Sequence, residues 1–83
     1  MIIHETSIVH PSSKIDDSVE IGPFCIVGEN VEIKKDTKLI SHVVIKGPTS
    51  IGANNTFYQY VKIDYRGKNI IYSFIKNSNI FFV

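Results

Sequence analysis

The stretch from residue 21 to residue 45 reads IGPFCIVGENVEIKKDTKLISHVVI. A large aliphatic residue begins it and recurs at every sixth position, and the same spacing continues in both directions along the chain. A period of six fits neither an α-helix, which repeats every 3.6 residues, nor a simple strand, which repeats every two. It fits a short strand followed by a corner, repeated many times. The large apolar residues at this period are Ile3, Val9, Ile15, Ile21, Val27, Ile33, Leu39, Ile45, Ile51, Phe57 and Ile63.

The residue four places after each of these positions is mostly small or β-branched, as at Cys25, Val31 and Thr37. Residues between them are polar or turn-forming, while Val, Ile and Thr supply β-propensity. We therefore predict an all-β fold, a parallel β-helix of hexapeptide repeats whose successive coils stack at about 4.8 Å. With three hexads to a coil, residues 1–63 make about four coils. An ordinary antiparallel β-domain is the alternative, although hairpins seldom keep one strict period over this length.

Length, composition and charge exclude several classes of protein. The chain has 83 residues, of which 43% are hydrophobic and 20% charged, as is typical of one globular domain. Its net charge of +1 argues against a polybasic surface for nucleic acid or membranes. No apolar run approaches the roughly 18 residues of a membrane-spanning helix, and the first residues lack the pattern of a signal peptide. We expect a small soluble intracellular domain without an internal disulfide, because Cys25 is its single cysteine.

Two stretches of the chain resemble the hexapeptide-repeat acyltransferases. The first is IGPFCIVG at residues 21–28, a pattern that related sugar and acyl transferases share. The second is SHVVIKGPTSIG at residues 41–52, followed by Asn55 and by Tyr58-Gln59-Tyr60, and it is similar to the UDP-N-acetylglucosamine O-acyltransferases of lipid A biosynthesis. Val9-His10-Pro11 is also similar to that family. The resemblance covers roughly residues 2–63.

This resemblance implies a left-handed triangular β-helix that assembles as a homotrimer in the cytoplasm. It implies transfer of a 3-hydroxyacyl chain from acyl carrier protein to the 3-hydroxyl of UDP-N-acetylglucosamine, the first step of lipid A biosynthesis. A histidine acts as general base in that reaction and a backbone amide holds the oxyanion. No metal or cofactor is implied, and neither nucleic acid nor membrane insertion is expected.

Members of the resembled family are much longer than this chain. Their catalytic histidine and substrate-binding residues lie beyond the segment that is matched, so we assign no catalytic, substrate-binding or metal-ligating residue. The chain acting alone is expected to be a non-catalytic truncated β-helix, able to join a trimer but unable to turn over substrate. The alternatives are an active O-acyltransferase and a fragment of another hexapeptide transferase, such as the N-acyltransferase of the same pathway.

Residues 64–83 differ in composition from the 63 residues before them. Ile, Asn, Phe, Tyr and Lys make up 14 of these 20 residues but only 24 of the preceding 63. The hexad also lapses, because Asn69 stands where an aliphatic residue is due, although Ile75 and Phe81 fall back in register. All five residue types are favoured by A/T-rich codons. We predict a divergent apolar tail that is out of frame or decayed, and a genuine short C-terminal strand pair is the alternative.

Several side chains could bind metal or catalyse, and each also has a simpler structural interpretation. His4 and His10 lie one hexad apart, so we expect them on neighbouring faces, and no third ligand at zinc spacing accompanies them. His42 could serve as a general base, but its counterpart in the resembled family is not the catalytic histidine. Cys25 lacks an activating histidine pattern, which favours a buried inert thiol. Asp16-Asp17 is interpreted as a solvated corner.

Charged and aromatic residues offer two candidate contact surfaces. Lys34-Lys35, with Lys38 and Lys46, could contact an acidic carrier protein, although a solvated face is the default interpretation. Tyr58 and Tyr60 could line a subunit contact or pack at a corner. Three glycines share the second hexad position and are interpreted as corner residues rather than a phosphate loop, because no helix follows; they are Gly22, Gly28 and Gly52.

Overall fold

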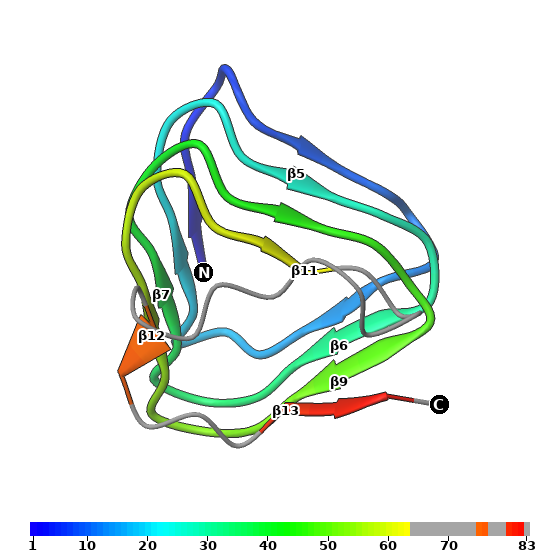
Figure 1. Cartoon of the computed structure of the whole chain (residues 1–83). Helices are drawn as coiled ribbons and strands as arrows, with labels where there is room; N and C mark the ends of the chain where they lie inside the picture. The colour runs from blue at the N-terminus through cyan, green and yellow to red at the C-terminus, as the bar shows by residue number, and fades with distance from the viewer. Residues whose placement is uncertain (64–74, 77–79, 83) are drawn as a thin grey trace.

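The computed structural model describes residues 1–63, 75–76 and 80–82, and it winds residues 1–63 into a three-sided coil (Figure 1). Each hexad supplies a strand of two or three residues and then a corner. No helix long and apolar enough to cross a bilayer occurs among the described residues. The strands of this coil are β1 (Ile2–Ile3), β2 (Ile8–Val9), β3 (Lys14–Ile15), β4 (Glu20–Ile21), β5 (Ile26–Val27), β6 (Val31–Ile33), β7 (Lys38–Leu39), β8 (Val44–Ile45), β9 (Thr49–Ile51), β10 (Thr56–Phe57) and β11 (Lys62–Ile63).

Each of the strands from β1 to β8 pairs in parallel with the strand three places later in the chain. The first face holds β1, β4, β7 and β10; the second face holds β2, β5, β8 and β11; the third face holds β3, β6 and β9. Each residue aligns with the one 18 positions on, as Ile3 aligns with Ile21 and Ile21 with Leu39. The predicted arrangement of three hexads to a coil is therefore confirmed, and the eleven strands make three coils and two strands of a fourth.

The core of the coil consists of the apolar residues that recur every six positions. From Ile21 onward each of them is buried. In the first coil Val9 and Ile15 are only partly buried and Ile3 is exposed, since no preceding coil covers them. Phe57 is the largest fully buried side chain. The small and β-branched residues four places on fill the space inside the corners, as Cys25, Val43 and Val61 do.

The corners of the coil are turned by residues in the left-handed backbone region. Their φ angles are 52–66°, and they recur at the hexad spacing: Phe24, Asn30, Asp36, His42, Asn54 and Tyr60. In the first coil a hydroxyl stands at each equivalent position and accepts the backbone N–H of the residue 18 positions later. These donor–acceptor pairs are Phe24 to Thr6 (2.9 Å), Asn30 to Ser12 (3.0 Å) and Asp36 to Ser18 (2.8 Å).

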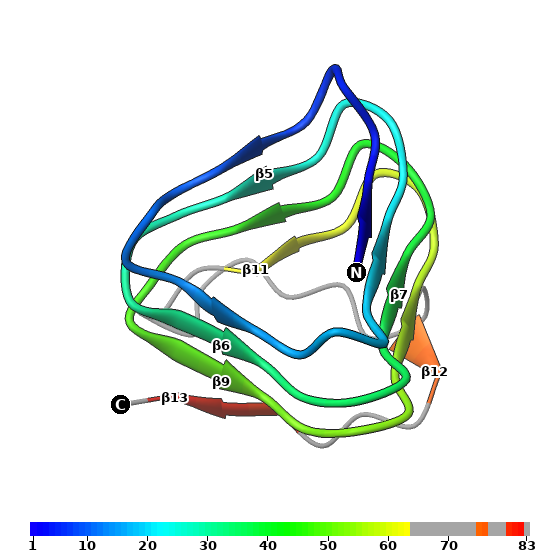
Figure 2. The same ribbon diagram turned by 180° about the vertical axis from the view of Figure 1, so that it is seen from behind.

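Two short strands of the tail each pair antiparallel with the last coil strand of a face. Strand β12 (Ile75–Lys76) pairs with β10, and strand β13 (Ile80–Phe82) pairs with β9. Figure 2 shows β13 lying along β9 on the side away from β6. Since all coil strands pair in parallel, these two strands do not continue the hexad solenoid. The predictions made for the rest of the tail, at 64–74, 77–79 and 83, lie outside the described residues.

Candidate functional site

The two N-terminal histidines lie on successive corners of the first coil. His4 Nδ1 is 2.8 Å from Thr6 Oγ1, and His10 Nδ1 is 2.8 Å from Ser12 Oγ. Each Nδ1 also accepts the backbone N–H of the same Thr or Ser, at 3.2 and 3.1 Å. Both rings therefore complete local turns. Among the described residues no group of three or more His, Cys, Asp or Glu side chains is placed to hold a metal ion.

Cys25 and Asp16 occupy the structural roles that their positions in the hexad suggest. The Cys25 side chain is buried inside a corner, and the loss of solvent around the thiol raises its pKa. A raised pKa leaves less thiolate at neutral pH, which opposes a nucleophilic role. Asp16 accepts hydrogen bonds from the Ser18 hydroxyl (2.6 Å) and backbone N–H (3.0 Å), and these bonds hold the pKa of its carboxyl below the ordinary value.

The four lysines singled out as a basic cluster are spread around the coil. Lys38 projects from the first face and its Nζ lies 3.4 Å from Glu20 Oε2 in a solvent-exposed ion pair. Lys34 and Lys35 follow β6 at the end of the third face, and Lys46 follows β8 at the end of the second face. The structure thus gives no single basic surface made of all four lysines.

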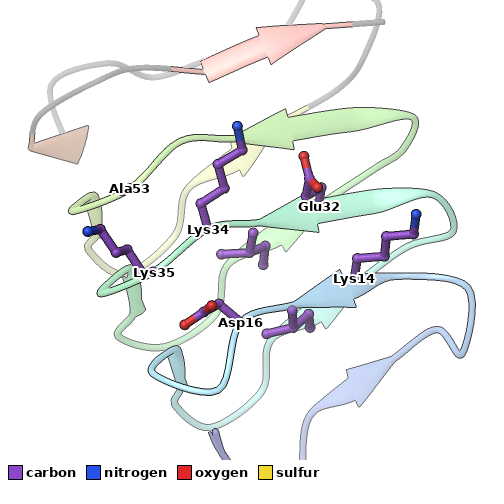
Figure 3. Close-up of a pocket in the computed structure, with 8 residues that line it drawn as sticks. Lys14, Asp16, Glu32, Lys34, Lys35 and Ala53 are labelled. Atoms are coloured by element: carbon purple, nitrogen blue, oxygen red, sulfur yellow. The ribbon is translucent and has the colours of Figure 1, made fainter.

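Lys34 and Lys35 help to line a hollow of about 500 Å³ on the third face. Figure 3 shows Lys14, Asp16 and Glu32 projecting around it from neighbouring coils, with Ala53 at its edge. Lysines and carboxylates both line this hollow, and Ile15 and Ile33, which belong to the core of the coil, lie between them in the chain. Mixed charges spread over an open face are typical of a solvated surface rather than of an enclosed reaction site.

One corner of the coil carries a column of aromatic rings, which we call the aromatic corner: Phe24, His42 and Tyr60. The His42 ring stands between the other two, with centroid distances of 5.2 Å to Phe24 and 5.1 Å to Tyr60. All three side chains are exposed, Tyr60 to 70%. The structure therefore places His42 in a ring stack and Tyr60 at a corner on the surface. The 18-residue spacing of the three rings was the sequence signal for this column, and the six-residue period alone does not reveal it.

The second face, which begins at this corner, has an aliphatic outer surface. Its outward side chains on the first three coils, which we call the aliphatic row, are Ile8, Ile26 and Val44. Ile8 is 65% exposed and Ile26 45%. Lys62 occupies the equivalent position on β11. Together the aromatic corner and the aliphatic row form a largely uncharged surface that can bind another molecule by contact but supplies no nucleophile.

The chain is similar to proteins of known name, although no protein-family model matches it. It is 46% identical over 70 residues to the acyl-[acyl-carrier-protein]–UDP-N-acetylglucosamine O-acyltransferase of Thermodesulfovibrio yellowstonii, covering 84% of this chain and 27% of that protein. It is 49% identical over 61 residues to the protein of the same name from Saccharophagus degradans, covering 74% of this chain and 24% of that protein. The chain thus spans about a quarter of the length of these curated relatives.

Two solved structures match the fold as well as the sequence. The UDP-N-acetylglucosamine acyltransferase of Francisella novicida superimposes with a TM-score of 0.73 at 50% identity, over 75% of this chain and 22% of that one. The UDP-N-acetylglucosamine O-acyltransferase of Moraxella catarrhalis RH4 gives a TM-score of 0.74 at 49% identity, over 76% and 24%. These neighbours are left-handed β-helices, so the hand expected from the resemblance is confirmed along with the fold.

Proposed function

Because this chain corresponds to the N-terminal portion of the UDP-N-acetylglucosamine O-acyltransferase family, we propose that it is the opening coil segment of such an enzyme and is not catalytic alone. The observation that carries this proposal is that about 50% identity and the same coiled backbone coincide over about three quarters of this chain. The described residues hold buried aliphatic ladders, hydrogen-bonded corners and an inert thiol, but no nucleophile paired with a base.

The proposed reaction of the whole enzyme is transfer of an acyl chain from acyl carrier protein to a hydroxyl of UDP-N-acetylglucosamine. The printed names of the relatives support both substrates. We further propose that the enzyme acts in lipid A biosynthesis in the cytoplasm and assembles as a homotrimer. An exposed, largely uncharged side of the coil supports assembly, because monomers seldom leave a large apolar surface in contact with water.

The chain by itself is expected to show no acyl transfer. Purified chain is incubated with 3-hydroxyacyl-loaded acyl carrier protein and UDP-N-acetylglucosamine, and acylated sugar nucleotide is quantified. The Francisella novicida enzyme, assayed at the same concentration, is the positive control. We predict product from the control and none from this chain, since a general base and oxyanion donors are required for the step. Measurable turnover by the chain would show that residues within it carry the chemistry.

We propose that residues 64–83 are a divergent end, out of frame or decayed, and not a continuation of the coil. The antiparallel direction of β12 and β13 supports this proposal, as does the lapse of the hexad at Asn69. The match to the Thermodesulfovibrio yellowstonii protein covers 70 of 83 residues, so it reaches at least residue 70 and counts against a change of frame before that residue.

The gene sequence tests this proposal directly. The other two reading frames are translated from the Tyr60 codon through and beyond the codon of Ile70. We predict that one of them resumes the hexads and then encodes a histidine-bearing segment like that of the relatives. If neither frame does so, the tail is a genuine C-terminal strand pair.

A further inference from the structure

We propose that copies of this chain associate through the aromatic corner and the aliphatic row, while the first and third faces stay in solvent. This inference rests on the proposed homotrimer and adds to it the surface that makes the contact. Two independent features of the coil meet at this surface. One is the difference in charge between the three faces, and the other is the choice of residues at the three corners.

The outward positions of the three faces differ sharply in chemistry. On the first face Glu20 and Lys38 form an ion pair, and on the third face the Ser50 hydroxyl donates to Glu32 Oε1 at 3.1 Å. Beyond the first coil both faces therefore carry polar or charged outward side chains, whereas in the first coil the first face exposes Ile2. On the second face the same strand position holds Ile8, Ile26 and Val44 on three successive coils. An exposed aliphatic strand surface on one side of a coil, beside charged surfaces on the other two, is typical of a surface that is covered in the assembled protein.

The corners point to the same surface. The left-handed backbone region is tolerated by Asn and Asp far better than by bulky residues. Two of the corners follow this rule with Asn30, Asp36 and Asn54. The corner that borders the second face instead places Phe24 and Tyr60, with His42 between them, in that region. These rings are exposed, so within one chain only their stacking on one another offsets the backbone strain. A contact of these rings with another molecule offsets the rest of the strain and accounts for their presence.

A second copy of the chain is the occupant that fits this surface best. The six residues that define this surface include no Asp, Glu, Lys or Arg, so identical surfaces meet without repulsion between such charges. The side chains of the aromatic corner and the aliphatic row repeat at the coil spacing of about 4.8 Å. A second copy whose coil axis runs parallel has the same spacing. The exposed apolar area of this surface is on the order of 500 Å². With a polar rim, burying this area on two copies reaches the roughly 1,200 Å² at the lower end of stable interfaces.

Two substitutions with the same chemistry on different faces test the proposal. Ile8 and Ile2 are both 65% exposed and both begin a strand of the first coil, on the second and first face respectively. In Ile8→Lys the new charge falls within the proposed contact, whereas in Ile2→Lys it falls outside it. A third variant, Tyr60→Asn, removes a ring from the aromatic corner and suits the left-handed backbone better, so the fold is retained.

The full chain and these variants are compared by sedimentation equilibrium over a range of concentrations, with circular dichroism to confirm the β-fold. We expect the original chain and Ile2→Lys to associate alike, and Ile8→Lys and Tyr60→Asn to need at least about tenfold higher concentration to associate. Equal association of Ile8→Lys and Ile2→Lys would overturn the proposed surface but leave the homotrimer standing. A monomeric original chain would overturn the proposed association of this chain, and neither result bears on the acyl-transfer assay.

Discussion

Replacing Gly22 by alanine is expected to unfold the chain. Gly22 follows β4 at the point where the next coil passes directly over it, and a Cβ built there would lie 1.8 Å from the carbonyl oxygen of Ile40. Backbone atoms of the adjacent coil cannot yield by that amount without breaking the ladder, in which the Gly22 N–H donates to the Leu39 carbonyl at 2.7 Å. We expect a loss of about 3 kcal/mol or more in the free energy of unfolding, comparable to the whole stability of a domain this small.

Gly28 provides a matched control for this substitution. It holds the same hexad position one strand later, but a Cβ there would lie 3.2 Å from the Ile45 carbonyl oxygen. A shift of a few tenths of an ångström accommodates that contact, and alanine also restricts the unfolded chain. We therefore expect Gly28→Ala to change stability by no more than about 1 kcal/mol. Urea unfolding followed by circular dichroism compares the two variants, and equal midpoints would contradict the close stacking of coils at Gly22.

The fold of residues 1–63 was predictable because one period governs it. A large apolar residue at every sixth position, as at Ile21, Val27 and Ile33, can be buried on one side of a chain that turns after each strand. Parallel pairing at 18 residues follows from three such strands in each coil. The hand of the coil does not follow, because the same period suits either hand, and it was supplied by resemblance.

The aromatic corner was not predictable from the hexad. The period of six treats Phe24, Asn30 and Asp36 as equivalent, since all three turn a corner with positive φ. Their difference appears only when residues 18 apart are compared, which separates the column of rings from a column that pairs Asn30 with Pro48 and one that pairs Asp36 with Asn54. Similarly, the lysines appeared to cluster in the sequence, but Lys35 and Lys38 lie on either side of a corner and therefore face different directions.

The tail shows where local sequence information is insufficient. Ile75 returns to the hexad register and would be expected to extend the first face in parallel, yet β12 pairs antiparallel with β10. A residue's register specifies which side of a strand it occupies, but the direction of the strand depends on the intervening chain. The hexad repeat lapses at Asn69, so the sequence beyond it does not predict the direction in which the strand runs.

Joining residues 1–63 of this chain to the later coils of a relative is expected to produce an active enzyme. The matched segment of the Francisella novicida enzyme is replaced by these residues, and the remainder of that enzyme supplies the missing chemistry. Equivalent strands on each of the three faces would then stack across the junction at the coil spacing. The gain is large, from no turnover by this chain to turnover within about tenfold of the intact enzyme, which corresponds to a barrier difference of about 1.4 kcal/mol.

The same chimaera carrying Gly22→Ala is the control, and it should lose both its β-fold and its turnover because Gly22 lies under Ile40 of the next coil. The measurement that tests the proposed function most directly is the rate of acyl transfer to UDP-N-acetylglucosamine by the chimaera and by this chain alone. We predict turnover by the first and none by the second. A chimaera that folds as a β-helix yet forms no product, or a chain that forms product alone, would contradict the assignment of this chain as a non-catalytic opening segment.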